Sequence, residues 1–140
     1  MNPVAIVYNT RAGIGKARSL VDELSAILEN KSMPYQLFED DWPTDYTDYS
    51  SVWIVGGDGT MNYFINHAKQ PLPPLALFKG GTGNDFATLL YGESTASEIV
   101  DIVLHTKPRN VDAGVCNGKL FLNMAGLGFD GEALKNMQTI

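Results

Sequence analysis

A short apolar run that ends in a glycine-rich turn, over residues 52–62, is the feature that most constrains the fold of this chain. Residues 52–55 are apolar, residues 56–60 read Gly-Gly-Asp-Gly-Thr, and a helical pattern follows at once. Four apolar residues before a turn are typical of a buried parallel strand. Glycines allow positive φ and close approach of a ligand, and Thr60 is a favourable N-cap residue. This order of strand, turn and helix predicts an anion site at the helix start.

The same order recurs along the chain. Apolar runs predict strands, and helical spacing of apolar residues predicts helices; the strands are expected at 3–9, 35–38, 52–55 and 75–78, and the helices at 20–28, 61–67, 86–90 and 99–104. Ser94 or Ser97 is the expected cap of the last helix. Strands that alternate with helices predict one α/β domain, a three-layer α/β/α sandwich with a mostly parallel sheet.

The pattern changes after residue 108. Two further strands, at 109–116 and 119–124, are expected on either side of Asn117-Gly118, a strong two-residue hairpin signal. Cys116 lies in the first of them among apolar neighbours, so we expect a core or half-buried thiol. Earlier in the chain, the acidic segment 39–48 is expected to be a solvated surface loop rather than a metal site.

Composition narrows the function classes. The net charge of −6 over 140 residues argues against a nucleic-acid partner, which usually requires a basic face. A single cysteine excludes an internal disulfide and a multi-cysteine metal site. The sequence has no apolar run near the roughly 20 residues of a membrane span and no signal-peptide pattern, so the expected location is cytoplasmic.

Three glycine-bearing loops, at 9–16, 56–62 and 80–85, follow three of the expected strands. In a parallel sheet such loops lie at the carboxyl ends of the strands, so we expect them to converge on one phosphate-binding crevice. Residues 10–17 lack the first glycine and the metal-binding hydroxyl of a Walker loop, and the dinucleotide glycine spacing is also absent. What remains is a backbone cradle with hydroxyl and amide side chains: Gly56, Gly57, Gly59, Thr60, Thr82, Asn9 and Asn62.

Three aspartates accompany these loops. Asp58 and Asp85 lie inside two of them, and Asp112 is expected on a later strand. A carboxylate beside bound phosphates is repelled unless a cation or a proton mediates, and carboxylates with phosphate oxygens suit Mg²⁺. The alternative for each is an aspartate that stabilises its own turn by a backbone hydrogen bond.

Two of these segments together resemble the paired signatures of the diacylglycerol kinase catalytic domain. They are Gly56-Gly57-Asp58-Gly59-Thr60 with Asn62, and Gly81-Thr82-Gly83-Asn84-Asp85-Phe86-Ala87. The loop that begins at Asn9 and the segments 111–114 and 121–130 resemble further parts of the family, so the resemblance spans nearly the whole chain. It is nearest to the bacterial soluble lipid kinases, which are related to sphingosine and ceramide kinases. The first signature is shared with NAD kinases, and the second favours a lipid kinase.

The resemblance implies an N-terminal domain of the NAD kinase and diacylglycerol kinase type and an ATP-dependent phosphorylation of a lipid hydroxyl, with a diacylglycerol-like or sphingoid substrate. It places ATP beside the residues matching the nucleotide-binding positions, which are Asn9, Gly56, Gly57, Asp58, Gly59, Thr60, Asn62 and Thr82. It assigns catalysis, and Mg²⁺ binding through water, to Asp58, Asp85 and Asp112.

The sequence also departs from the family pattern. Thr10 follows Asn9 where the family usually has proline, and residues 39–41 occupy the region of a strand-end threonine that often contacts the nucleotide. Family members carry a second, mostly β domain with the expected general base. We therefore expect residues 1–140 to be a nucleotide-binding N-terminal domain without the C-terminal β-rich domain, which binds ATP weakly and turns over poorly by itself.

The expected partners are a lipid substrate and, transiently, a membrane surface reached by peripheral contact. A homodimer is the oligomeric state left open. Two other functions also remain open on the sequence: an NAD kinase-like enzyme, and a nucleotide-binding module without catalysis.

Overall fold

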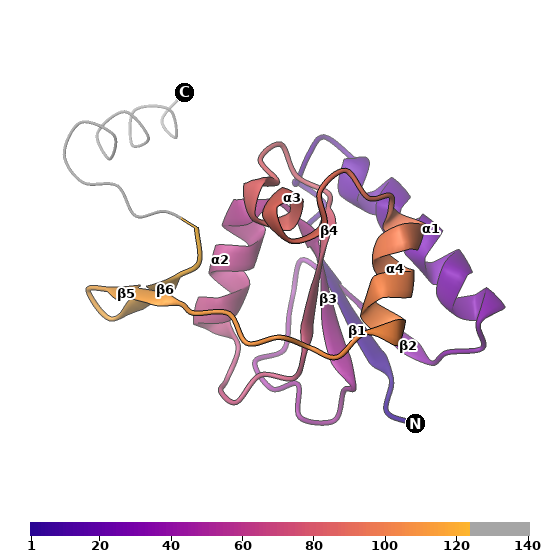
Figure 1. Cartoon of the computed structure of the whole chain (residues 1–140), viewed down its shortest axis with the longest axis horizontal. Coiled ribbons are helices and arrows are strands. Elements are labelled where there is room, and N and C mark those ends of the chain that lie inside the picture. Colours follow the sequence, from indigo (N-terminus) through magenta and orange to yellow (C-terminus); the bar gives the residue numbers. More distant parts are fainter. Residues whose placement is uncertain (124–140) are drawn as a thin grey trace.

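A sheet of four parallel strands forms the centre of the molecule (Figure 1). The structure is a computed structural model that describes residues 1–123. The strands lie in the order β2-β1-β3-β4, with bounds β1 Val4–Tyr8, β2 Tyr35–Glu39, β3 Ser51–Gly56 and β4 Leu75–Lys79. The flanking helices are α1 Lys16–Asn30, α2 Asp58–His67, α3 Asp85–Tyr91 and α4 Ala96–His105.

Each face of this sheet carries its own hydrophobic cluster. Alternate strand residues point to opposite faces, so Val4 and Ile6 of β1 pack with α1 and α4, whereas Ala5 and Val7 pack with α2 and α3. Figure 1 shows α1 and α4 on one side of the strands and α2 and α3 on the other. The predicted three-layer α/β/α sandwich with a parallel sheet is therefore confirmed.

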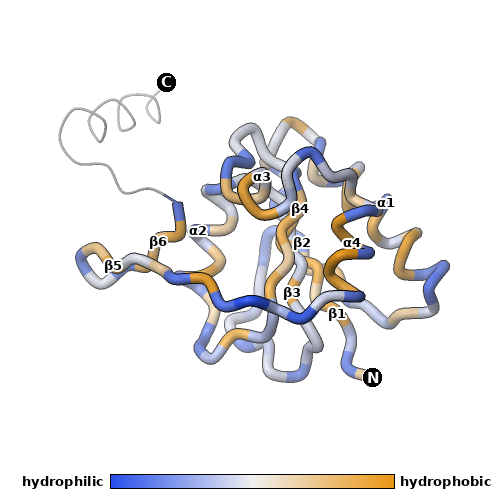
Figure 2. Tube along the Cα trace, viewed as in Figure 1, coloured by the Kyte–Doolittle hydropathy of each residue, from blue (hydrophilic) through white to orange (hydrophobic). Residues whose placement is uncertain are grey.

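The central strands are the most apolar part of the chain. All five residues of β1 are buried, as expected for a parallel strand covered on both faces, whereas β2 at the sheet edge is half exposed. Figure 2 shows the hydrophobic colour along the strands and α4, and a hydrophilic segment between α4 and β5. Within residues 1–123, the structure contains no helix long and apolar enough to cross a membrane.

Two helix starts differ from the sequence expectation. Helix α2 begins at Asp58 with Gly57 as its N-cap, so Thr60 lies inside the first turn and is not the cap. Helix α4 is capped by Thr95, not by Ser94 or Ser97. The Thr95 hydroxyl accepts from the Glu98 N–H, and the Glu98 carboxylate accepts from the Thr95 N–H; this reciprocal capping box satisfies two backbone donors at once.

The predicted hairpin is present but shorter than expected. Strands β5 (Gly114–Cys116) and β6 (Lys119–Phe121) pair antiparallel around Asn117 and Gly118, whose φ values of 48° and 76° suit a two-residue turn. Residues 109–113 are not in a strand, and the Cys116 thiol is exposed rather than buried. Both expectations were wrong because the hairpin lies beside α2 and does not join the main sheet.

One side chain attaches this hairpin to α2. The Asn66 amide donates to the carbonyl of Leu120 at 2.8 Å and accepts from the N–H of the same residue at 2.9 Å. Leu120 and Leu122 pack against the α2–α3 cluster.

The acidic segment after β2 is more ordered than a solvated loop. Its acidic side chains are exposed, but Trp42 and Tyr46 are buried against Phe64 of α2. The expectation of a solvated loop rested on the acidic residues alone, whereas the buried aromatic residues Trp42 and Tyr46 pack this segment onto the domain.

Candidate functional site

The carboxyl ends of β1 and β3 form the switch point of this sheet. These two strands are neighbours, yet the helix that follows β1 covers one face and the helix that follows β3 covers the other. In open α/β sheets, ligands bind in the crevice outside the carboxyl ends of two such strands. The topology alone therefore predicts a ligand site at the β1–α1 and β3–α2 loops.

The three glycine-bearing loops meet at this edge. A Cβ atom added to Gly13 would lie 2.5 Å from the Gly80 carbonyl oxygen, so the first and third loops touch. A Cβ on Gly57 would overlap the carbonyl of Gly83, and one on Gly81 would overlap the backbone of Gly57, so the second and third loops are also in backbone contact. The predicted convergence of the loops is confirmed.

The reason for glycine in the turn after β3 differs from the expectation. Gly56, Gly57 and Gly59 do not have positive φ, and the left-handed residues are instead Gly13, Ile14 and Gly15 in the β1–α1 loop. Gly56 leaves room for the Thr60 side chain, 2.5 Å from an added Cβ. A Cβ at Gly59 would meet nothing within 4 Å. The protein itself therefore leaves open space above the first turn of α2.

Asp58 bridges two of the loops. Its carboxylate oxygens accept the N–H groups of Asp85 (3.0 Å) and Phe86 (2.9 Å) at the start of α3, while its own N–H donates to the Gly83 carbonyl at 3.0 Å. These partners lie 27 and 28 residues away. Asp58 therefore does more than stabilise its own turn. It joins the glycine-rich turn at residues 56–60 to the second signature at residues 81–87.

Asn84 belongs to the second signature, but the sequence pattern assigned it no role. Its side-chain oxygen accepts from the Gly81 N–H at 3.2 Å and its amide donates to the Gly81 carbonyl at 2.9 Å, which closes the third loop. Asparagine side chains commonly bond to backbone groups a few residues away, so an asparagine in the glycine-rich segment 80–84 was an available signal.

The other predicted residues are distributed as follows. Thr82, Asp85 and Asn62 are exposed around the same edge, and Asn9 accepts the Arg11 N–H at 2.8 Å, which forms a turn at the start of the β1–α1 loop. Asp112 is exposed on the segment between α4 and β5.

Within residues 1–123, the structure has no group of three His, Cys, Asp or Glu side chains placed to ligate a metal. Mg²⁺ binding through water, as predicted, is a weaker requirement and stays a prediction.

A cavity of about 390 Å³ opens beside Asp58. It lies between α2, the start of α3 and the hairpin, and apolar groups dominate its lining: Met61, Phe86, Phe121 and Leu122, with Asp58, Gly59, Asn62 and Asn123. One carboxylate thus lies at the wall of a mostly apolar space.

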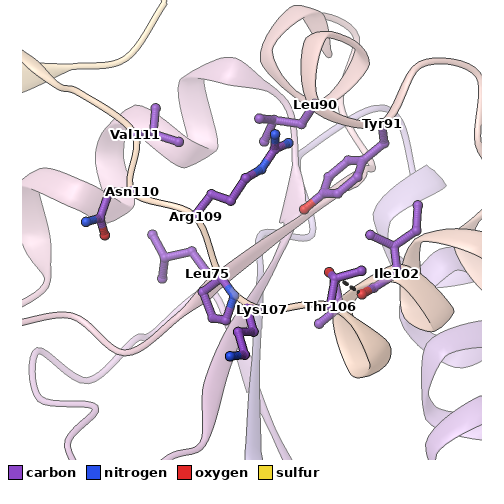
Figure 3. A pocket seen from close by; sticks show the side chains of 11 residues that line it. Leu75, Leu90, Tyr91, Ile102, Thr106, Lys107, Arg109, Asn110 and Val111 are labelled. Carbon is purple, nitrogen blue, oxygen red and sulfur yellow. Dashed lines mark hydrogen bonds between the residues drawn. The ribbon is translucent and has the colours of Figure 1, made fainter.

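A larger cavity, about 440 Å³, lies away from the loops, beside Leu75 of β4 and under residues 106–111 (Figure 3). Tyr91 lines it, and burial raises the pKa of its hydroxyl. The three glycine loops and the carboxylates at the start of α2 and α3 do not line this cavity, so its size does not make it the better candidate.

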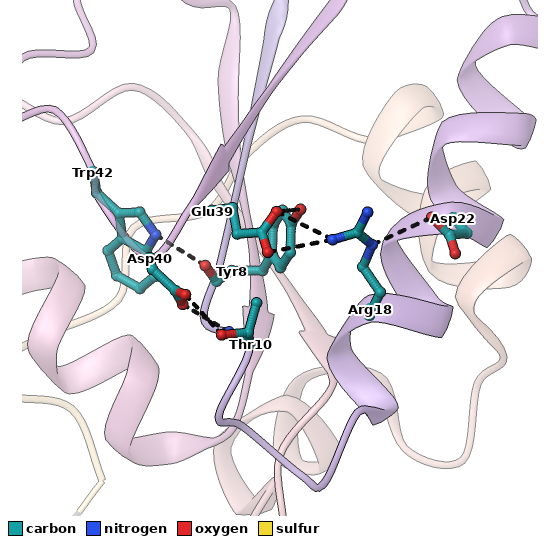
Figure 4. A network of polar contacts seen from close by, with 7 residues as sticks. All are labelled: Tyr8, Thr10, Arg18, Asp22, Glu39, Asp40 and Trp42. Carbon is teal, nitrogen blue, oxygen red and sulfur yellow. Dashed lines mark hydrogen bonds and ion pairs between the residues drawn. The ribbon is translucent and has the colours of Figure 1, made fainter.

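A polar network surrounds the other end of the crevice (Figure 4). The Tyr8 hydroxyl donates to Glu39 at 2.9 Å, and burial, together with this carboxylate, raises the pKa of Tyr8. Arg18 of α1 lies 3.1 Å from Glu39; this pair is largely exposed, so it contributes at most about 1 kcal/mol. Asp40 accepts from the N–H and the hydroxyl of Thr10, and these hydrogen bonds lower the pKa of Asp40.

Known proteins resemble this chain both in sequence and in fold. Residues 3–116 match the family model of the diacylglycerol kinase catalytic domain. The chain is 29% identical over 134 residues to a diacylglycerol kinase of Staphylococcus haemolyticus and 26% identical over 136 residues to that of Staphylococcus carnosus. The crystal structure of a diacylglycerol kinase from Bacillus anthracis has the same fold, with a TM-score of 0.65 at 23% identity.

These matches cover most of this chain but only part of each relative. The two staphylococcal alignments cover 88% of the chain and 41% and 44% of the relatives, and the structural match covers 87% of the chain and 48% of its counterpart. The chain therefore spans less than half the length of these relatives.

Proposed function

Because the chain belongs to the diacylglycerol kinase catalytic domain family, we propose that it is the ATP-binding part of a lipid kinase, which transfers the γ-phosphoryl group of ATP to a lipid hydroxyl. The observation that carries the proposal is the turn after β3. It lies at the switch point, makes backbone contact with the second signature, and leaves open space at Gly59 over the first turn of α2. Free N–H groups at a helix start are a site for phosphate oxygens.

Phosphoryl transfer depends mainly on positioning and on charge neutralisation. The turn at residues 56–60 would hold the triphosphate by backbone N–H groups other than that of Asp58, which donates to the Gly83 carbonyl. Asn62 and Thr82 would contribute side-chain donors. Asp58 and Asp85 supply hard oxygen donors at the same edge, which fit Mg²⁺ held through water. A bound Mg²⁺ would offset the charge of the phosphates. We propose Asp112 as a third member of this set on the family resemblance alone, since its neighbours Asn110 and Val111 line the cavity beside Leu75, away from the loops.

The apolar cavity beside Asp58 supports a lipid as the acceptor. A lipid that enters this 390 Å³ space would place its apolar part against Phe86, Phe121 and Leu122 and its reacting hydroxyl near the Asp58 carboxylate.

Two exposed apolar side chains lie near this edge of the sheet. Ile14 on the β1–α1 loop is 102% accessible, and Leu89 on α3 is 76% accessible. They support a peripheral and transient membrane contact. We further propose a cytoplasmic enzyme.

Calorimetric titration of the chain with ATP, with and without Mg²⁺, tests this function. We expect ATP to bind more tightly with Mg²⁺, and NAD to give no signal at the same concentrations. A second assay adds radiolabelled ATP and vesicles containing diacylglycerol, and we expect the chain alone to transfer little or no phosphate.

The outcomes separate the alternatives. Binding and phosphorylation of NAD would replace the lipid kinase by an NAD kinase-like enzyme. Efficient lipid phosphorylation by the chain alone would contradict its role as half of a site, and no ATP binding at all would contradict the proposal as a whole.

A further inference from the structure

The cavity of about 440 Å³ lies at the free edge of the main sheet, and we call it the edge cavity (Figure 3). Within residues 1–123, β4 is the last strand on this side of the sheet. Leu90 of α3 and Val103 of α4 come from helices on opposite faces of the sheet, yet both line this cavity, together with Leu75 of β4. The edge cavity therefore lies where the two helical layers meet beyond the last strand.

The size and the lining of the edge cavity suit a small apolar molecule. Small-molecule sites have volumes of roughly 300–1,000 Å³ and a mostly apolar lining, with a few polar groups that orient the ligand. The apolar residues here are Leu75, Leu90, Ile102, Val103 and Val111. Ile102 and Val111 are still 38% and 52% exposed, so a ligand could remove further apolar surface from water. This lining favours an alkyl chain.

One cation of the lining is directed into this space. The Arg109 guanidinium points toward Leu90 and Tyr91 in Figure 3, whereas the Lys107 ammonium points away from them. Among residues 1–123, no carboxylate lies within 4.0 Å of Arg109. A guanidinium presents a planar fork of N–H donors that matches a carboxylate. One directed cation thus provides for a monoanionic head group.

The Tyr91 hydroxyl is a second donor in the edge cavity. The other hydroxyl of the lining, that of Thr106, already donates to the Ile102 carbonyl at 2.6 Å. Burial raises the pKa of Tyr91, so its phenol is neutral at pH 7 and keeps its hydrogen for donation.

We propose that the edge cavity binds a single-chain fatty acid, with the alkyl chain between α3 and α4 and the carboxylate held by the Arg109 guanidinium and the Tyr91 hydroxyl. This site is separate from the phosphate crevice, because none of the three glycine-bearing loops lines it. It does not rest on the proposed kinase function, and its test is independent of ATP binding.

An amide chemical-shift titration of the ¹⁵N-labelled chain with octanoate tests the proposal. We expect saturable shifts at residues 75, 90–91, 102–103 and 106–111. Octanol keeps the chain without the charge, and acetate keeps the charge without the chain. We expect each of them to bind at least about 10-fold more weakly than octanoate, because each loses one part of the interaction.

Arg109→Gln removes the cation at an exposed position, so the variant is expected to fold. Its affinity for octanoate should fall about 10-fold, the size of a hydrogen bond to a charged group, while octanol binding stays unchanged. Arg11→Gln makes the same change at an exposed arginine of the β1–α1 loop, outside the edge cavity, and should bind octanoate as the native chain does.

Three results would overturn the proposal. Without saturable octanoate binding, the edge cavity is left as a surface against which further polypeptide packs. Largest shifts beside Asp58 would place the fatty acid in the other apolar cavity. Equal octanoate affinity in Arg109→Gln and the native chain would remove the assignment of the carboxylate to Arg109.

Discussion

Gly57→Ala is expected to lower the free energy of unfolding by about 3 kcal/mol, at the upper end of the usual cost of overpacking. The added methyl group would overlap the carbonyl of Gly83, and both groups belong to backbone, so no side-chain rotation relieves the clash. The φ of −100° at Gly57 is accessible to alanine, so the loss arises from contact and not from backbone strain. Thermal denaturation should show a midpoint lower by roughly 10 °C.

Gly59→Ala is the matched control, two residues along the same turn. An added Cβ meets nothing within 4 Å there, and alanine is the better helix former, so we expect stability to be unchanged or slightly raised. ATP affinity should nevertheless fall at least about 10-fold, because the methyl group occupies the space through which phosphate approaches the helix start. Equal losses of stability in both variants would show that the two glycines are needed for packing alone.

Asp58→Asn is expected to have the other large effect. One of the two backbone N–H groups at the start of α3 would then face an amide NH₂ group, and an unsatisfied donor costs about 2 kcal/mol. In the complete lipid kinase of which we propose this chain to be part, ATP-dependent lipid phosphorylation should fall at least about 100-fold. Both quantities are measured on purified variants, by denaturant titration and by radiolabelled phosphate transfer.

Asp85→Asn tests whether a carboxylate at this edge is needed for phosphate transfer, apart from any contribution to stability. The Asp85 side chain is exposed at the first residue of α3, where its charge contributes at most about 1 kcal/mol through the helix dipole. We therefore expect near-native stability with a clear loss of phosphate transfer, whereas Asp48→Asn in the exposed acidic segment should change neither. Near-native transfer by Asp58→Asn, together with its loss of stability, would reduce Asp58 to a structural residue.

The sequence predicted the parts of the fold that depend on local pattern. The apolar runs that became β1, β3 and β4, the Asn117-Gly118 turn and the paired glycine-rich segments all carried their signals within a few neighbouring residues. The family resemblance drawn from those segments is confirmed by the match over residues 3–116. The segment resembling the family at 121–130 extends beyond the described residues.

The expectations that failed depend on long-range packing. The exposure of Cys116 follows from where the hairpin docks, and the caps at Gly57 and Thr95 follow from where the chain enters each helix. The reason for glycine at position 57 lies 24 or more residues away, in the backbone at Gly81 and Gly83. Local spacing contains none of this information, because these contacts exist only once the loops have met.

The most direct test of the central claim, that the β1–β3 switch point binds the triphosphate of ATP, is an amide chemical-shift titration of the ¹⁵N-labelled chain with ATP and Mg²⁺. We predict that the largest shifts fall on the backbone N–H groups of residues 56–62 and 80–85, with smaller shifts at residues 9–15. Largest shifts around the cavity beside Leu75, or shifts spread evenly over the surface, would contradict the claim.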